Sequence, residues 1–177
     1  RGTLFRIAEW YGWTGNPNEG LRMTDGDIGR GIREREEDIK KFYEIGRIQP
    51  GPADSSIFDA DPGKDSIASG VNAGYWGRKG GQDVFTKADK SPGSRRARLE
   101  ALRRRLRAGL AERMEEPGLF IFNTCTDGFI RTVPVLPRSE RDPEDVDTEA
   151  EDHAYDEAGY RLTAAKKIAR RVKVRMG

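Results

Sequence analysis

The sequence predicts an α/β protein in which a mixed sheet is flanked by helices. Short segments rich in β-branched and aromatic residues alternate along the chain with longer segments of helical periodicity, as is typical of this class. Residues 118–122 form a continuous apolar run of strand length, which indicates a strand buried on both faces. Residues 94–114 place leucines three and four positions apart, as the buried stripe of a helix does: Leu99, Leu102, Leu106 and Leu110.

The elements of the first half of the chain are separated by glycine and proline. We expect a strand over residues 3–10 and, after a loop rich in glycine, a helix over 24–42 with its isoleucines on one side. A short strand is expected over 53–58, because proline-containing turns bound it. A helix over 66–76 and a strand over 84–88 follow.

The last helix is predicted over residues 148–166. Thr148 and Glu151 have the spacing of a capping box, and acidic residues in the first turn suit the positive end of the helix dipole. We therefore expect one domain over residues 1–165. The remaining segment, 166–177, carries lysine and arginine without any acidic residue, which favours a disordered basic tail.

The composition excludes several classes of protein. A single cysteine, Cys125, excludes an internal disulfide, and with a single histidine, His153, it excludes the common structural zinc sites. No apolar run is long enough to cross a bilayer, so no membrane partner is expected. Gly63 and Lys64 resemble the end of an ATP-binding P-loop, but Phe58 stands where its first glycine is required.

The charges are strongly segregated, although the formal net charge is only +2. Arginines dominate residues 95–113, acidic residues dominate 140–157, and all the charges from 161 onward are basic. This distribution suits a protein that holds a polyanion near an acidic, cation-binding centre. The alternative is that these runs are solvated faces and a disordered tail.

Carboxylates are the strongest candidates for chemistry. Asp54 lies in or at the end of a predicted strand, and Asp152, His153 and Asp156 lie three and four positions apart on a predicted helix, where they share one side. One strand carboxylate and one helix carboxylate could bind Mg²⁺ or Mn²⁺, and two such ions about 4 Å apart would support phosphodiester cleavage. The alternative is that Asp54 is a turn residue and that Asp152 and Asp156 are solvated acids on the surface of a helix.

Ordered blocks of the sequence resemble the C-terminal nuclease domain of tailed-bacteriophage large terminase subunits. The blocks are residues 2–13, 51–59, 88–94 and 145–156, and the stretch 129–136 resembles the same family. They occur in the family's order and cover nearly the whole chain. The resemblance implies an RNase H-like fold that cuts double-stranded viral DNA with carboxylates and two Mg²⁺ or Mn²⁺ ions.

The same resemblance assigns roles to single residues. Asp54 and Asp156 match the second and the last metal-binding carboxylates of the family and are the expected catalytic metal ligands. His153 matches the histidine that accompanies the last one, and Asp152 is the expected supporting residue. The family's first catalytic aspartate has no counterpart before Thr3, so we expect a domain that lacks the first strands and leaves a sheet edge open.

The resemblance also implies partners and a setting. The partners are double-stranded DNA, a terminase ATPase domain, a small terminase subunit and a portal, and the setting is genome packaging in the host cell cytoplasm. Two other functions are compatible with the residues: another RNase H-like nuclease, such as a resolvase or a transposase core, and a non-catalytic DNA-binding or docking module of the packaging motor.

Basic residues near the predicted cleft are candidates for DNA contacts. The arginines of residues 94–114 could track phosphates with salt-dependent affinity, or they could solvate a helix that packs through its leucines. Lys90 could face a phosphate from the loop after a strand, or it could belong to a plain turn. The residues expected to contact DNA are Lys90, Arg95, Arg96, Arg103, Arg104 and Arg107.

Overall fold

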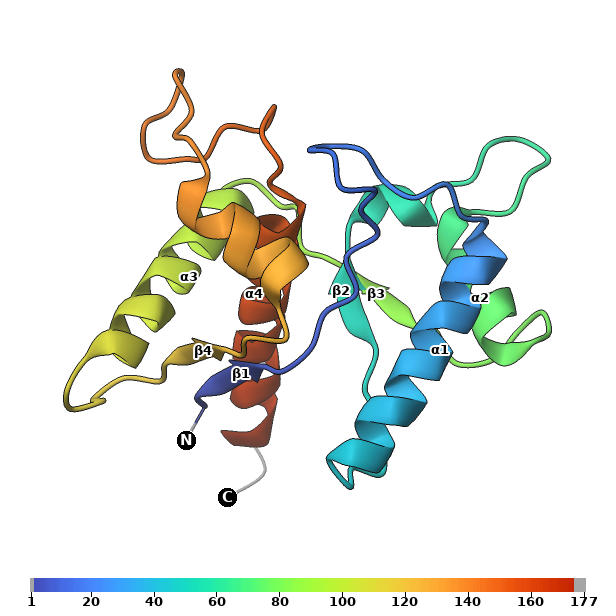
Figure 1. Cartoon of the computed structure of the whole chain (residues 1–177), viewed down its shortest axis with the longest axis horizontal. Helices are drawn as coiled ribbons and strands as arrows, with labels where there is room; N and C mark the ends of the chain where they lie inside the picture. Colours follow the sequence, from blue (N-terminus) through green and yellow to red (C-terminus); the bar gives the residue numbers. More distant parts are fainter. Residues whose placement is uncertain (1, 174–177) are drawn as a thin grey trace. The chain divides into compact units, whose positions relative to one another are not determined.

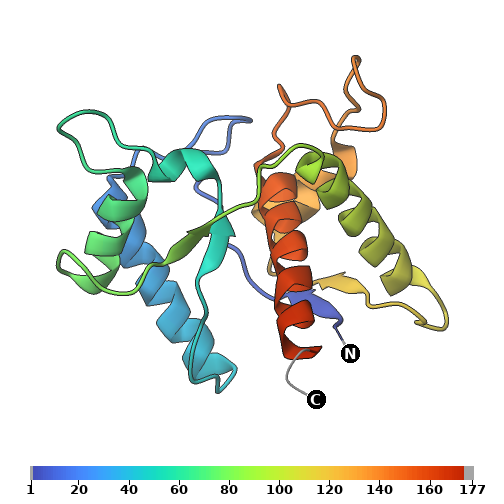
Figure 2. The same cartoon turned by 180° about the vertical axis from the view of Figure 1, so that it is seen from behind.

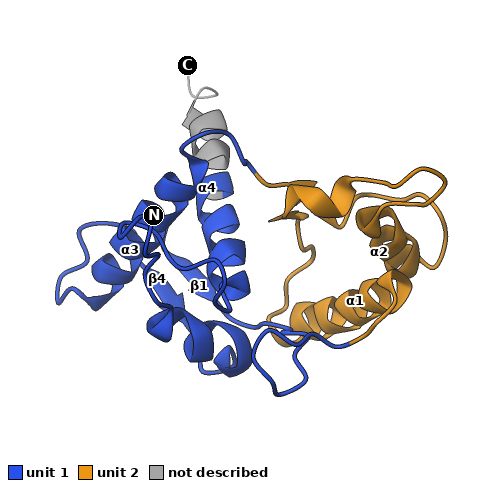
Figure 3. Ribbon diagram, turned by 90° about the horizontal axis from the view of Figure 1, so that it is seen from above, with its two compact units in different colours: residues 1–21, 89–177 blue, residues 22–88 orange. Residues whose placement is uncertain are grey.

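The computed structural model describes residues 2–173, with side chains described for residues 2–164. The chain forms two compact units (Figure 3): unit 1 comprises residues 1–21 and 89–177, and unit 2 comprises residues 22–88. Each unit combines helices with one pair of parallel strands, so the predicted α/β class is confirmed. Within the described residues, however, the strands form two separate two-stranded sheets rather than the single mixed sheet that was expected.

Unit 2 contains two helices and one strand pair (Figure 1). The helices are α1 (Asp25–Phe42) and α2 (Ile67–Trp76), and the parallel strands are β2 (Gly51–Ala53) and β3 (Phe85–Lys87). Both helices and β3 agree closely with the prediction. Each helix begins one residue late, because the residue before it is an N-cap whose hydroxyl accepts a backbone N–H.

The strand predicted over residues 53–58 is wrong beyond its first residue. After β2, the carboxylate of Asp54 accepts a hydrogen bond from the Ser56 N–H at 2.9 Å, and a 3₁₀ helix, η1 (Ser55–Phe58), follows. An aspartate side chain can accept a hydrogen bond from the backbone N–H two residues later. This local bond competes with the backbone hydrogen bonds of a β-sheet. Asp54 therefore lies just after the end of β2.

Unit 1 contains two helices that pack against each other and against the second strand pair (Figure 2). The helices are α3 (Ser94–Leu110) and α4 (His153–Lys173), and β1 (Leu4–Arg6) pairs in parallel with β4 (Leu119–Ile121). A buried apolar cluster joins these elements: Leu99, Ala101, Leu102, Leu119, Cys125, Phe129, Val146, Ala154, Tyr155, Ala158 and Leu162.

The ends of β1 and α3 and the burial of β4 differ from the prediction. β1 ends at Arg6 because its partner β4 is only three residues long. α3 ends at Leu110 rather than at residue 114. The backbone is extended at the next residue, and Leu110 is 87% exposed, so the leucine stripe stops one turn early. β4 is only half-buried after Leu119 rather than buried on both faces, since a two-stranded sheet leaves much of each strand uncovered.

The capping box predicted at Thr148 is wrong. α4 begins at His153, and Glu151 is engaged elsewhere, because its carboxylate accepts two hydrogen bonds from the Arg131 guanidinium at 2.7 and 2.9 Å. Glu151 also accepts the Tyr11 hydroxyl at 2.8 Å. A tertiary ion pair has thus replaced the local cap.

The end of the chain is described only in part. α4 extends to Lys173, into the predicted basic tail, while residues 174–177 and all side chains from 165 lie outside the described part. Disorder of that tail and a single domain over residues 1–165 stay predictions. None of the helices described here combines the length and the apolar character that crossing a membrane would need.

Candidate functional site

The predicted catalytic residues come from different units. Asp54 belongs to unit 2, where it is half-buried at the end of β2, while Asp156 and His153 belong to unit 1 and lie in the first turn of α4. The two-metal arrangement stays a prediction. The part of the site that the structure describes in full is the start of α4 and the helix packed against it.

Asp152 and Asp156 share one side of α4, as their spacing predicted. The Asp156 N–H donates to the Asp152 carbonyl at 2.9 Å, which places the two carboxylates one helical turn apart. Asp152 is buried, whereas the His153 side chain is 69% exposed and its Nδ1 lies 3.9 Å from Asp152 Oδ1. His153 therefore borders the acidic pair from the solvent side.

The guanidinium of Arg95, from the first turn of α3, lies among three carboxylates. Its Nε donates to Asp145 Oδ2 at 2.5 Å, its Nη2 is 3.6 Å from Asp152 Oδ2, and its Nη1 is 3.9 Å from Asp156 Oδ2. Arg98 adds a second guanidinium, with Nη2 3.6 Å from Asp156 Oδ1. We call these five residues (Asp145, Asp152, Asp156, Arg95 and Arg98) the charge cluster.

Arg98 is the member of the charge cluster that the sequence analysis missed. Its side chain is only 5% exposed, its Nη1 donates to the Asp89 carbonyl at 3.2 Å, and its guanidinium carbon lies 4.6 Å from the centre of the Tyr160 ring. The signal was present in the sequence, because Arg98 lies four residues before Leu102 and therefore on the apolar stripe of α3.

The charge cluster and its neighbour Tyr155 hold all the buried side-chain polar atoms that lack a hydrogen-bond partner within the described part of the chain. The atoms are Arg95 Nη2, Arg98 Nε, Asp156 Oδ1 and the Tyr155 hydroxyl. Buried polar atoms in folded proteins are normally paired, so four at one place are unusual. The four atoms comprise two guanidinium donors, one carboxylate acceptor and one hydroxyl.

Electrostatics at the cluster follow from burial and from like charge. Burial, and then the neighbouring carboxylate of Asp156, raise the pKa of Asp152, although Arg95 opposes the shift. Burial also raises the pKa of the Tyr155 hydroxyl to about 12, with Asp145 and Asp156 adding to it. Two carboxylates that repel each other are a setting in which a cation binds favourably.

The chemistry of these donors fits a divalent metal ion, but the ligand set is incomplete. Carboxylate oxygens such as those of Asp152 and Asp156 are the hard donors that Mg²⁺ and Mn²⁺ prefer. Among the residues described, no three or more histidine, cysteine, aspartate or glutamate side chains gather so that they could hold a metal ion. Arginines occupy the space around this pair instead.

Most of the predicted DNA-binding residues of unit 1 are exposed to solvent. Lys90, Arg96, Arg104 and Arg107 are exposed, whereas Arg103 is half-buried. An open groove of about 700 Å³ beside α3 is lined by charges of both signs: Arg103, Arg104, Arg107, Arg113, Glu100, Glu115, Glu116 and Glu144. DNA contacts stay a prediction for these residues, while Arg95 is turned toward the charge cluster.

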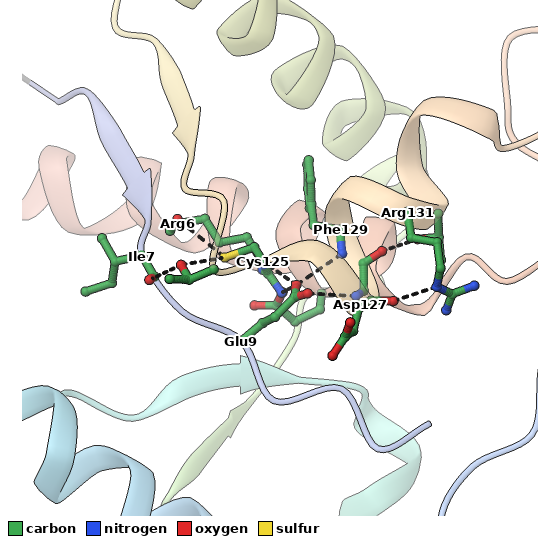
Figure 4. A network of polar contacts seen from close by, with 11 residues as sticks. Arg6, Ile7, Glu9, Cys125, Asp127, Phe129 and Arg131 are labelled. Atoms are coloured by element: carbon green, nitrogen blue, oxygen red, sulfur yellow. Dashed lines mark hydrogen bonds and ion pairs between the residues drawn. The ribbon is translucent and has the colours of Figure 1, made fainter. Parts of the chain in front are cut away.

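A second polar network joins Glu9, which follows β1, to residues 128 and 129 (Figure 4). The carboxylate of Glu9 accepts the N–H groups of Gly128 and Phe129 at 2.7 and 3.1 Å, at a π-helical turn over residues 126–130, and Arg6 donates to it at 3.3 Å. Cys125, in the same network, is fully buried, and burial raises the pKa of its thiol. This environment is typical of an inert structural cysteine rather than a nucleophile.

Comparisons with known proteins give no match, whether with protein-family models, curated proteins or solved structures.

Proposed function

We propose that the chain is a divalent-metal-dependent endonuclease domain that cuts double-stranded DNA during bacteriophage genome packaging. The terminase resemblance suggests this activity, and one observation in unit 1 supports it. Asp152 and Asp156, which offer oxygen donors to a cation, lie directly against the start of the arginine-rich helix α3. A phosphodiester hydrolase needs both a cation site and phosphate contacts.

The proposed role of each residue follows from the chemistry of its side chain. Asp156 would supply an oxygen ligand to a divalent ion, which when bound would activate a water and stabilise the leaving oxygen. The resemblance assigns a ligand role to Asp54 of unit 2 as well. His153 is exposed beside Asp152 and orients the reacting groups or moves a proton. Arg96, Arg104 and Arg107 contact the phosphates of the DNA.

The proposed setting follows the same resemblance. The domain acts in the host cell cytoplasm on double-stranded DNA, together with a terminase ATPase domain, a small terminase subunit and a portal. Sequence-independent phosphate contacts suit such a substrate, because packaging must handle a whole genome rather than one short site.

Plasmid cleavage tests the assignment of the two aspartates. With supercoiled plasmid and Mn²⁺, we expect nicking that a chelator abolishes, and Asp54→Asn and Asp156→Asn should each lower its rate at least about 100-fold because a hard anionic ligand is removed. Asp65→Asn and Asp142→Asn remove exposed aspartates from units 2 and 1 and serve as matched controls. Nicking that survives the chelator, or survives Asp156→Asn, would contradict the proposal.

A DNA-binding experiment tests the arginines of α3 separately. Reversing Arg103, Arg104 and Arg107 to glutamate should weaken binding and lower the slope of log affinity against log salt by about 0.9 for each phosphate that the variant no longer neutralises. Reversing Arg30 and Arg33 in α1 of unit 2 is the control for a general change of charge. An unchanged slope in the triple variant would mean that the arginines of α3 are only solvated surface.

A second function is favoured by one observation. Arg95 and Arg98 neutralise part of the charge of Asp156, and no complete ligand set occurs among the described residues, as a non-catalytic DNA-binding or docking module would also show. Salt-dependent DNA binding without any Mn²⁺-dependent nicking would identify that module.

A further inference from the structure

Unit 2 contains a recess that the proposed function does not use. It lies where the second half of α1, the end of α2 and the segments that lead into β2 and β3 meet, and its volume is about 150 Å³. This volume corresponds to about five water molecules at ~30 Å³ each, which is room for one planar ring system but not for a drug-sized ligand.

Two aromatic rings from the end of α2 line the recess. The ring centres of Tyr75 and Trp76 are 5.0 Å apart, and the rings meet edge to face. Both are held at their polar atoms, because the Tyr75 hydroxyl donates to Glu36 at 2.5 Å and Trp76 Nε1 donates to the Gln82 carbonyl at 2.8 Å. Trp76 is nevertheless 38% exposed, so part of its indole is open to a planar ligand.

The polar side chains around these rings are oriented by bonds to one another. Arg47 Nη2 donates to Gln82 Oε1 at 2.8 Å, which uses only one of the N–H groups of the guanidinium. Asn72 Nδ2 donates to Asp83 Oδ1 at 2.9 Å. Within the described part of the chain, the Gln82 amide nitrogen and Asp83 Oδ2 have no hydrogen-bond partner, so the recess offers a donor and an acceptor beside the rings.

The lining of the recess carries no net charge. Its cations are Lys40 and Arg47, and its anions are Glu36 and Asp83. This balance suits a neutral, flat ring with donors and acceptors along its edge. The groove beside α3 is also lined by charges of both signs, but no aromatic residue lines it, so only the recess combines rings with polar groups.

A nucleobase has this chemistry. Proteins bind an unstacked base by stacking it on an aromatic side chain and by hydrogen bonds to its edge. The cations at the same recess are available to the phosphate next to the base. Duplex DNA does not fit, because its bases are stacked on one another and expose no free face.

We infer that the recess of unit 2 binds one unstacked base of single-stranded DNA, which stacks on Trp76 and bonds Gln82 and Asp83 through its edge. This site goes beyond the proposed nuclease function, because it needs neither a metal ion nor the carboxylates of α4. It gives the protein a means of holding a strand whose bases are already unpaired, where no energy is spent on opening a duplex.

Binding to a strand without bases tests this inference. The full chain is titrated, in the presence of a chelator, with labelled single strands of about 12 thymidines or of the same number of abasic sugar-phosphates, and binding is followed by fluorescence anisotropy. The abasic strand keeps the phosphates and lacks the rings. The thymidine strand should therefore bind at least about tenfold more tightly.

Substitutions at the recess separate stacking from packing. Trp76→Leu removes the ring and should weaken binding of the thymidine strand about tenfold, while the affinity for the abasic strand stays the same. Trp76→Phe keeps an aromatic face and should stay within about threefold of the wild type. Phe42→Leu is the matched control, because Phe42 is a 79% exposed ring of unit 2 outside the recess, and it should change binding by less than about twofold.

Three results would overturn the inference: equal affinity of the wild type for the two strands, a Trp76→Leu protein that still prefers the thymidine strand, and equal losses from Trp76→Leu and Phe42→Leu. Thymidine monophosphate that competes as well as the strand would overturn the assignment to a strand and identify a free nucleotide instead. Failure of the nuclease proposal appears separately, as absent Mn²⁺-dependent nicking. Circular dichroism checks the fold, and Trp76→Met replaces the leucine variant if that one unfolds.

Discussion

The two units solve the same problem, the packing of one helix on another, by opposite means. In unit 2, α1 and α2 approach so closely that a Cβ on Gly29 would overlap the Val71 carbonyl oxygen and lie 2.6 Å from the Tyr75 nitrogen. In unit 1, α3 and α4 meet across the buried side chains of Arg98 and Asp152. The first interface includes a direct approach of backbone at a glycine, and the second combines an apolar cluster with buried charges.

The difference indicates where the proposed catalytic function resides. Where two helices pack at glycines, their backbone N–H and C=O groups are already hydrogen-bonded within each helix. Such an interface leaves no polar atom for a ligand. Among the side chains described, the buried atoms without hydrogen-bond partners all lie in the charge cluster and on Tyr155, and none lies in unit 2. Proteins tolerate such local violations chiefly at functional sites, because elsewhere they only cost stability.

The largest effect is expected from a substitution that disrupts the close approach of α1 and α2 at Gly29. Gly29→Ala should destabilise unit 2 by about 3 kcal/mol, since a methyl group there meets backbone, which yields less than a side chain. Hydrogen exchange of the amides in α1 and α2 measures this directly.

Gly26→Ala is the matched control on the same helix. The nearest atom to its new methyl is Arg30 Nη1 at 3.6 Å, an ordinary contact, so alanine should leave stability unchanged or raise it by up to about 1 kcal/mol. If Gly29→Ala behaved like this control, the close approach of α1 and α2 would be contradicted.

A smaller effect is expected in the charge cluster. Arg98→Met should lower the free energy of unfolding by about 2 kcal/mol, because Asp156 is left without a buried cation and the Asp89 carbonyl without this donor. Arg104→Met removes an exposed guanidinium 3.6 Å from Glu116 and should cost less than about 0.5 kcal/mol. Denaturant unfolding measures both. Increased stability of Arg98→Met would mean that the buried charges oppose folding outright.

The smallest effect concerns Asp152 and depends on pH. Burial and Asp156 raise the pKa of Asp152 in the folded state, so its ionisation disfavours folding as the pH rises through that value. Asp152→Asn should therefore raise the unfolding free energy at pH 7 by on the order of 0.5 kcal/mol. The difference should vanish below the ordinary pKa of 3.8.

Thermal unfolding across pH 3 to 7 compares Asp152→Asn with Asp142→Asn, which removes an exposed negative charge nearby. A gain of stability that is largest at low pH would reverse the assigned sign and show that Asp152 is stabilised as the anion.

Local features of the fold were predictable from the sequence. The caps at Thr24 and Ser66 fix the starts of α1 and α2, and the spacing of Asp152 and Asp156 fixes their common side of α4. One error was local, because the Asp54 carboxylate accepts the Ser56 N–H and ends the strand. Another occurred where a distant partner intervenes. Glu151 has the sequence spacing of a capping residue, but Arg131 holds it in an ion pair, and no local pattern encodes that choice.

The sequence by itself determined which residues carry charge, which segments are helical and which acids share a helix face, because these depend on covalent spacing within a few residues. Only the tertiary structure decided that Arg95 and Arg98 turn inward to the carboxylates of Asp145, Asp152 and Asp156 while Arg96 and Arg104 stay exposed. The reason is physical: the energy of a charge depends on its burial and on partners some fifty residues away, and folding alone sets both.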